Sequence, residues 1–238
     1  MVNAMCQLVK KDGFWYNMDA THIELLGLEF KANHFYDKEL DIEGVKQLAR
    51  FLARIVDAKS PFTFHHSEKV ALLAKLVAKD CGVSDTDAEL LYVAGLLHDV
   101  GKLKTPDLLL HKEGKLTKEE YSIVKRHTVD TEHTLHRFFP KSVIGEWASN
   151  HHERLDGSGY PFSKQQEQLD LPSRILAVVD VFQALTQKRP YRGSLSLSEI
   201  GDIMQPMVDK GQLDAGVYSI LLADIDNFYQ LSTQEFSA

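Results

Sequence analysis

Cysteine is scarce in this sequence. Cys6 and Cys81 are its two cysteines, and neither belongs to a Cys-x-x-Cys pair, so we expect no disulfide framework and no cysteine zinc site. Long apolar runs are missing as well, since none approaches the roughly 18 residues of a membrane span. Residues 1–11 lack the apolar region of a signal peptide. These absences predict a cytoplasmic protein that makes no contact with a membrane.

Positively charged residues are fewer than negatively charged ones. The chain of 238 residues carries 27 lysines and arginines against 34 aspartates and glutamates, a net charge of −7. Binding to the backbone of a nucleic-acid polymer needs a basic surface, so no such partner is expected. A small anionic substrate needs only a local basic pocket and is compatible with this charge.

The sequence also lacks a series of alternating apolar residues that would predict a β-sheet. From Asp41 onward, apolar residues recur at helical spacing, which predicts an all-α fold. Thr117 with Glu120 forms one capping box and Ser196 with Glu199 another, and Pro206 is expected to disturb its helix. The predicted helices cover residues 41–56, 66–77, 84–98, 117–138, 143–153, 173–186, a segment from 196, and 215–229.

Residues 1–40 form a stretch apart from this helical pattern, with Trp15, Tyr16 and a short alternating run at residues 25–30. We interpret the stretch as a lead-in segment and the remnant of an upstream domain. Residues 41–238 then make up one helical domain, a length that suits a single hydrophobic core.

A histidine and an aspartate stand side by side where an apolar helix is predicted to end, in the run His98-Asp99-Val100-Gly101-Lys102. Imidazole and carboxylate suit a divalent metal of intermediate hardness. The two oxygens of Asp99 would allow it to bridge two ions, and Gly101 would permit a tight turn after the pair. On its own, the pair is better explained by a capping aspartate beside a core histidine.

Further histidines and one acid fall in or beside apolar helical segments. His151 and His152 are adjacent and precede a glycine-rich loop, while His66 and His127 stand alone. Asp180 sits inside an apolar run, where a charge is costly unless it is paired or bound to metal. Solvated or hydrogen-bonded polar groups would explain each residue separately, and a salt bridge would explain Asp180. Their joint pattern favours a metal site.

This joint pattern resembles the HD superfamily of metal-dependent phosphohydrolases. The added His127, the run His151-His152-Glu153 and the run Gly159-Tyr160-Pro161 are similar to its HD-GYP branch. The resemblance extends from about residue 41 to about residue 222 and includes HDVGK, GKLTKEEY, HHERLDGSGYP, LPSRILAVVDVFQALTQKRPYR and DKGQLDAGVYSIL. It implies an HD-domain helical bundle with the C-terminal helical extension of the HD-GYP branch.

The resemblance implies two divalent metal ions as cofactors. Iron or manganese is expected, with zinc, nickel, cobalt or magnesium able to replace them in purified protein. Asp99, as the bridge, and Lys102, which matches a lysine that contacts the scissile phosphate, would be the catalytic residues. Arg189 and Arg192 match basic residues near the second phosphate, and Tyr160 is expected beside the substrate. The implied ligands are His66, His98, Asp99 and Asp180 for one ion and Asp99, His127, His151 and His152 for the other.

Three positions depart from the family pattern. Lys69 stands where an arginine is usual, which keeps the charge but loses a planar fork. Gln183 replaces a second aspartate after Asp180 and puts a contact to Lys102 in doubt. Phe62 stands where members with three metals carry a glutamate, so two ions are expected rather than three.

Members of this bacterial family hydrolyse cyclic di-GMP to linear pGpG and on to GMP, and the resemblance implies the same phosphodiesterase activity here. It also implies GGDEF-domain or other signalling proteins as partners. Nothing in the sequence reads the bases, so another cyclic dinucleotide such as 3',3'-cyclic GMP-AMP is an open alternative. A weakly active relative that serves as a binding or docking module is another. The run Gly159-Tyr160-Pro161 argues against an HD enzyme that acts on other nucleotides.

Overall fold

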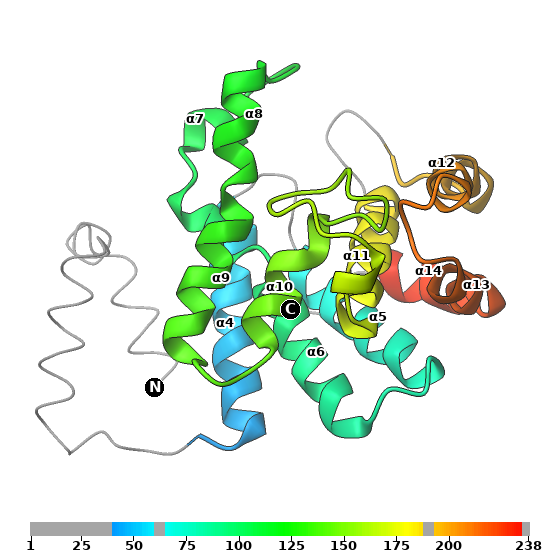
Figure 1. The fold of residues 1–238 in the computed structure, drawn as a ribbon, viewed down its shortest axis with the longest axis horizontal. Coiled ribbons are helices and arrows are strands. Elements are labelled where there is room, and N and C mark those ends of the chain that lie inside the picture. The colour runs from blue at the N-terminus through cyan, green and yellow to red at the C-terminus, as the bar shows by residue number, and fades with distance from the viewer. Residues whose placement is uncertain (1–39, 60–64, 188–192, 235–238) are drawn as a thin grey trace, which may run out of the picture. The chain divides into compact units, whose positions relative to one another are not determined.

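The computed structural model describes residues 40–59, 65–187 and 193–234, which are mainly helical (Figure 1). None of these residues belongs to a β-strand, and Asp156 with Gln165 forms an isolated bridge. The predicted all-α class is therefore confirmed. The chain divides after Asp41, and everything described below lies in the unit Ile42–Ala238. The lead-in segment at residues 1–40 falls outside the described residues except for Leu40, so its role stays a prediction.

The described helices follow one another with short connections. The α-helices are α4 (Ile42–Lys59), α5 (His66–Asp80), α6 (Asp85–Leu97), α7 (Asp107–Leu110), α8 (Lys118–Lys125), α9 (His127–Phe138), α10 (Ile144–Ser149), α11 (Leu171–Thr186), α12 (Leu197–Asp209), α13 (Ala215–Ala223) and α14 (Ile225–Thr233). Short 3-10 helices among the described residues are η2 (Val100–Lys104), η3 (Asn150–His152) and η4 (Gln166–Gln168). None of the described helices is both long enough and apolar enough to cross a bilayer.

The predicted helix caps are present. The hydroxyl of Thr117 accepts a hydrogen bond from the amide of Glu120, and the carboxylate of Glu120 accepts one from the amide of Thr117. Ser196 and Glu199 form the same reciprocal pair at the start of α12. The side chain of Ser84 caps α6. Each cap satisfies amides that have no partner inside the helix, which fixes where the helix begins.

Three helix predictions were wrong in their extent. The helix predicted over residues 117–138 is interrupted at Arg126, whose amide bonds the carbonyl three residues earlier at 3.3 Å. The helix predicted over residues 215–229 is interrupted at Asp224, which leaves the helical region with φ −134° and ψ 41°. Conversely, α12 continues past Pro206 to Asp209. Pro206 lies in the last turn, so the missing N–H removes one hydrogen bond, to the carbonyl of Asp202, and the helix ends within three residues.

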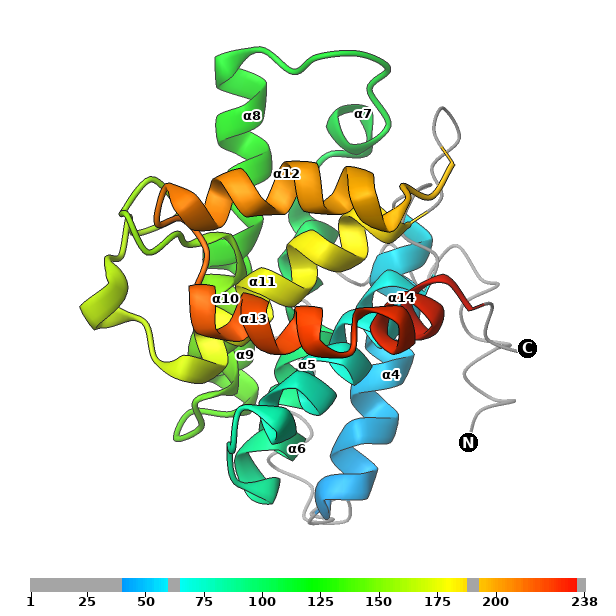
Figure 2. The ribbon, with the colours of Figure 1, turned by 90° about the vertical axis from the view of Figure 1, so that its right-hand side faces the viewer.

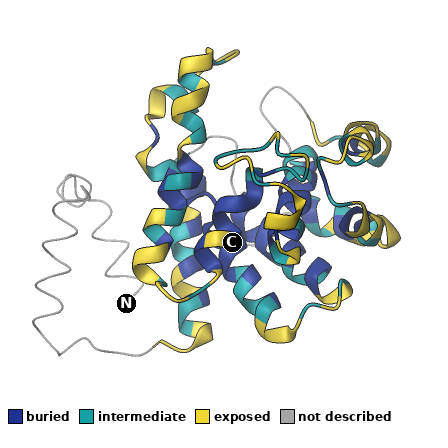
Figure 3. Ribbon diagram, viewed as in Figure 1, coloured by how far each residue is buried: buried dark blue, intermediate teal, exposed yellow. Residues whose placement is uncertain are grey.

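The hydrophobic core lies where α5, α6 and α11 pack together, and α9 and α10 close one side of it. Figure 3 shows the buried residues gathered on these central helices. Helix α8 has no buried residue and projects away from the core with α7 (Figure 1). Helices α12 and α13 both run alongside α11 (Figure 2). The ends of α5, α6, α9 and α10 thereby come close to the middle of α11.

Candidate metal centre

The seven predicted ligands lie close together, although they come from five separate segments. Among them, His66 opens α5, His127 opens α9 and Asp180 lies in the middle of α11. His98 follows the end of α6 directly. All of them except His127 border a cavity of about 140 Å³, whose lining residues are His66, His98, Asp99, Lys102, His151, His152, Asp180, Ala184 and Gln187.

Two groups of ligand atoms can be distinguished. In the first, Nε2 of His66 lies 3.2 Å from Nε2 of His98 and 3.3 Å from Oδ1 of Asp180. In the second, Nε2 of His127 lies 3.3 Å from Nε2 of His151. The third member of the second group is His152, and the ligand atoms within each group all lie within 4.8 Å of one another. The division matches the ligand sets that the sequence resemblance implies.

Asp99 lies between the two groups. Its Oδ2 is 3.3 Å from Nε2 of His98, while its Oδ1 is 3.4 Å from Nε2 of His127 and 3.8 Å from Nε2 of His151. Oδ1 is buried and accepts no hydrogen bond from any described residue. A buried, unsatisfied carboxylate oxygen is costly unless a cation or another donor occupies its surroundings. This geometry fits a carboxylate that bridges two cations.

Three of the histidines are oriented by hydrogen bonds to backbone close by in the chain. Nδ1 of His98, His127 and His151 donates to the backbone carbonyl three residues earlier, at 2.8, 2.7 and 2.6 Å respectively. A ring that carries its proton on Nδ1 presents an unprotonated Nε2. These local hydrogen bonds therefore aim Nε2 of each ring toward the other candidate ligands, an arrangement typical of histidine ligands.

The donor set fits divalent cations. The Nε2 atoms that face each other at 3.2 and 3.3 Å need either a shared proton or a cation between them, because two unprotonated nitrogens cannot hydrogen-bond. Two nitrogen ligands at about 2.1 Å from one tetrahedral ion lie about 3.4 Å apart, which is close to the observed separations. The ligand atoms are nitrogen and oxygen, with no sulfur, so metals of intermediate hardness suit the site.

Burial governs the protonation of the histidines. It lowers the pKa of His127 to about 4 and that of His152 to about 3, so both rings are neutral near neutral pH and able to bind metal. Burial acts on His98 in the same direction, but the adjacent carboxylate of Asp99 outweighs it and raises the pKa of His98 to about 9. Without a cation, His98 therefore holds the positive charge that the buried carboxylates favour.

Gln183 contacts a ligand histidine rather than Lys102. Nδ1 of His66 donates to the side-chain oxygen of Gln183, which leaves Nε2 of His66 facing the cavity. The sequence put a contact between residue 183 and Lys102 in doubt. In the structure the ammonium of Lys102 pairs with Oδ2 of Asp99. Because Gln183 lies one helical turn after Asp180, both residues face the same group of ligands.

Gly101 is required for a reason other than the predicted tight turn. A Cβ atom on Gly101 would lie 2.0 Å from the carbonyl oxygen of His127. The amide of Gly101 donates to the hydroxyl of Thr131 at 2.9 Å, and that hydroxyl donates to the carbonyl of His98 at 3.0 Å. The backbone of η2 thus lies directly against α9, which places Lys102 and His127 beside the same carboxylate, that of Asp99.

The glycine-rich loop is fastened to the segment that carries His151 and His152. The buried carboxylate of Glu153 accepts hydrogen bonds from the amides of Phe162 at 2.7 Å and Lys164 at 3.0 Å. The amide of Tyr160 donates to the carbonyl of His152 at 3.1 Å. The half-buried ring of Tyr160 consequently lies 4.7 Å from the ring of His152, beside the cavity where substrate was expected. Sequence reasoning gave Glu153 no role, although an acid directly after two ligands is a usable signal.

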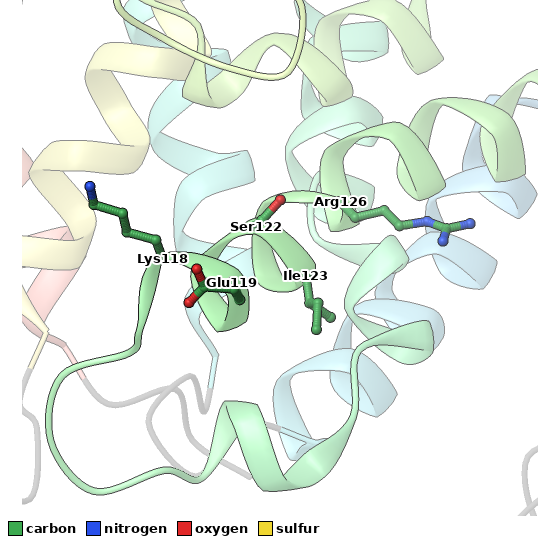
Figure 4. Close-up of a pocket in the computed structure, with 5 residues that line it drawn as sticks. All are labelled: Lys118, Glu119, Ser122, Ile123 and Arg126. Carbon is green, nitrogen blue, oxygen red and sulfur yellow. The ribbon is translucent and has the colours of Figure 1, made fainter.

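A larger and shallower hollow of about 600 Å³ lies on α8. Figure 4 shows the side chains that line it, which are Lys118, Glu119, Ser122, Ile123 and Arg126. None of them is buried, and the hollow contains no histidine. The residues suited to binding a metal therefore lie at the smaller cavity and not at this hollow. Arg189, Arg192 and Phe62 lie outside the described residues, so the expectations attached to them stay predictions.

Comparison with known proteins gives a family and several relatives. Residues 50–217 match the HD domain family. The chain is 47% identical over 235 residues to the 3'3'-cGAMP-specific phosphodiesterase 1 of Vibrio cholerae, which covers 99% of this chain and 54% of that protein. It is 39% identical over 139 residues to a cyclic di-GMP phosphodiesterase of Pseudomonas aeruginosa, covering 58% of this chain and 34% of that protein.

One solved structure is similar in both sequence and fold. The crystal structure of a cyclic GMP-AMP specific phosphodiesterase from V. cholerae matches with a TM-score of 0.52 and 30% identity, over 94% of this chain and 51% of that one. The chain thus spans about half or less of the length of these relatives.

Proposed function

The chain belongs to the HD domain family, in its HD-GYP branch, and from this we propose that it is a metal-dependent phosphodiesterase that hydrolyses 3'3'-cGAMP. The observation that carries the proposal is the pair of ligand groups joined by Asp99, whose Oδ2 faces His98 and whose Oδ1 faces His127. We further propose residues 41–238 as the catalytic domain and residues 1–40 as a lead-in segment.

The substrate proposal departs from the expectation of cyclic di-GMP. The relative that is 47% identical over nearly the whole chain is named for 3'3'-cGAMP, whereas the 39% identical relative named for cyclic di-GMP matches over 58% of the chain. A solved structure similar to this chain is likewise named for cyclic GMP-AMP. These findings support the cyclic GMP-AMP alternative better than cyclic di-GMP, which becomes the second candidate substrate.

The proposed metals are two divalent ions, iron or manganese, held by His66, His98, Asp99 and Asp180 on one side and by Asp99, His127, His151 and His152 on the other. Such a pair supplies an activated water and stabilises charge on the phosphoryl oxygens. With nitrogen and oxygen donors, affinity alone does not select iron or manganese over zinc, nickel or cobalt.

The chain's own residues would hold the phosphate in place. Lys102 lines the cavity with its ammonium beside Asp99, and a phosphate oxygen that enters the cavity comes within reach of this charge. A lysine in that position stabilises the negative charge that builds up on the phosphoryl group. We propose Lys102 and Asp99 as the catalytic residues, with Arg189, Arg192 and Tyr160 as substrate contacts. GGDEF-domain or other signalling proteins remain proposed partners.

A binding or docking module is the alternative from a different class, and the replacement of the usual aspartate by Gln183 is the observation in its favour. The test is product analysis by chromatography with manganese- or iron-loaded protein on 3'3'-cGAMP, cyclic di-GMP and cyclic di-AMP. We expect linear dinucleotide or mononucleotides to appear fastest from 3'3'-cGAMP. Binding of the dinucleotides without hydrolysis, in protein that holds both ions, would support the module instead.

A further inference from the structure

A row of aromatic rings leads outward from the metal ligands. The ring of Tyr160 lies 4.7 Å from that of His152 and 6.4 Å from that of His127. The ring of Tyr121, on α8, lies 6.2 Å from that of Tyr160 and is inclined to it by 79°. Tyr121 is 46% exposed, whereas His127 is buried. The rings therefore form a path from the cavity to the solvent.

Lys125 lies against both tyrosines of this row. Its ammonium is 5.3 Å from the ring centre of Tyr121 and 5.7 Å from that of Tyr160. Tyr121 and Lys125 are four residues apart and so share one face of α8. Within the described part of the chain, Lys125 forms no salt bridge, and aromatic faces are its neighbours. A positive charge without an acidic partner thus stands beside the path into the metal centre.

Tyr160 differs from Tyr121 and Lys125 in how firmly its position is fixed. Tyr160 is fastened by its own amide and by the clamp that Glu153 forms on the residues after it. Tyr121 and Lys125 stand on a helix without buried residues. A flat ligand can therefore be held between the fixed ring of Tyr160 and the side chains of Tyr121 and Lys125, which can change rotamer.

We propose that Tyr121, Lys125 and Tyr160 form a subsite for one purine base of the substrate, an inference that rests on the proposed function. Every purine presents an aromatic face that stacks on tyrosine. Guanine carries two acceptors, N7 and O6, on one edge, whereas adenine carries N7 beside an amino donor. The ammonium of Lys125 can serve both guanine acceptors, so the subsite favours guanine. The phosphate next to this base then lies at the metal ligands.

The subsite makes the base, rather than the phosphate, responsible for part of the affinity. Removal of Tyr121 or Lys125 should therefore raise KM for 3'3'-cGAMP and leave hydrolysis of bis(4-nitrophenyl) phosphate, which lacks a purine, unchanged. A purely structural role for the same side chains would lower the metal content and the rates on both substrates together.

The experiment compares Tyr121→Ala, Tyr121→Phe and Lys125→Met with two controls on the same helix. Ile123→Ala removes a side chain that is 48% exposed, close to the 46% of Tyr121, and that points about 200° away around the helix. Lys118→Met removes the same charge as Lys125→Met about 10.5 Å along the helix axis. Metal content and melting temperature are measured for all five variants.

We expect Tyr121→Ala to raise KM for 3'3'-cGAMP about fivefold or more, in line with the loss of one stacked base. Tyr121→Phe and both controls should keep the wild-type KM. Lys125→Met should reduce the preference for 3'3'-cGAMP over cyclic di-AMP. An unchanged KM in both Tyr121→Ala and Lys125→Met, or equal losses on the two types of substrate, overturns the subsite.

A binding arm separates this proposal from the proposed function. Calorimetric titration of EDTA-treated protein with 3'3'-cGAMP measures binding without hydrolysis. If loaded wild-type protein hydrolyses the dinucleotide but Tyr121→Ala binds it as well as wild type does, the subsite fails and the function stands. If wild type binds without hydrolysing and Tyr121→Ala loses binding, the function fails and the subsite stands. If wild type neither binds nor hydrolyses any cyclic dinucleotide, both fail.

Discussion

Nδ1 of His66 donates a hydrogen bond to the side-chain oxygen of Gln183, a residue 117 positions later in the chain. The contact joins the start of α5 to α11 and orients the histidine of its group whose Nδ1 has a side-chain acceptor in place of a backbone carbonyl. His98, in the same group, uses the carbonyl of Gly95 instead. The glutamine that departs from the family pattern thus holds a ligand in place.

Gln183→Leu should weaken metal binding, because His66 would lose the acceptor that fixes its ring. Loss of such a partner typically reduces metal affinity roughly 10- to 100-fold. Competition titration with a chelator measures the effect. The control is Gln187→Leu, which changes another residue lining the cavity. An affinity for both ions equal to that of wild type would show that Gln183 does not orient His66.

Asp99→Ala should abolish hydrolysis, because a bridging carboxylate contacts both ions. We expect less than half of the wild-type metal content by elemental analysis and turnover lowered at least about 100-fold. Asp130→Asn is the matched control, since Asp130 is also a buried acid but pairs with Lys104 and Arg126 instead of with the candidate ligands. Full metal content with near-normal turnover in Asp99→Ala would remove Asp99 from the bridging role.

Lys102→Ala should keep its metal and lose rate. Removal of one group that stabilises phosphoryl charge costs roughly 100-fold or more in turnover. Single-turnover rates on 3'3'-cGAMP, measured beside the metal content, separate the two effects. Lys104→Ala, on the same 3-10 helix, removes a lysine that is 55% exposed and pairs with Asp130. Parallel loss of metal and activity in Lys102→Ala would make Lys102 a structural residue.

Glu153→Gln should loosen the loop that carries Tyr160. An amide can accept through only one atom, so one of the N–H groups of Phe162 and Lys164 would face an NH₂ group. The free energy of unfolding should fall by about 1–3 kcal/mol, as measured by urea denaturation. Glu146→Gln is the control, because Glu146 is 54% exposed and its pair with Lys164 is a surface contact worth less than about 1 kcal/mol. Equal stability of the two variants would contradict the clamp.

Local signals in the sequence predicted much of the fold. Thr117 with Glu120, and Ser196 with Glu199, cap helices where they were expected to, because a capping side chain acts on amides two or three residues away. The breaks at Arg126 and Asp224 have no such local marker. They reflect tertiary packing, which bends or ends a helix whose apolar spacing continues.

The candidate site, like the fold, was predictable from the sequence only in part. Metal-ligating residue types were visible as His98-Asp99 and His151-His152, and the structure brings them together with His66, His127 and Asp180. The ring of Tyr121 against that of Tyr160 could not be foreseen, since the contact joins residues 39 positions apart, with α9 and α10 between them. Tyr121 and Lys125 share one helix face shortly before His127, and this spacing is the signal that could have drawn attention to α8.

The carbonyls that accept from Nδ1 of His98, His127 and His151 each lie three residues before the ring. These rings are therefore aimed by contacts that are local in the chain, and we expect folding to precede metal loading. A protein built in this way can release one cation and take up another while it stays folded. We therefore expect the metal found in a given preparation to depend on which metals were present during expression and purification. Metal exchange should then restore activity without refolding.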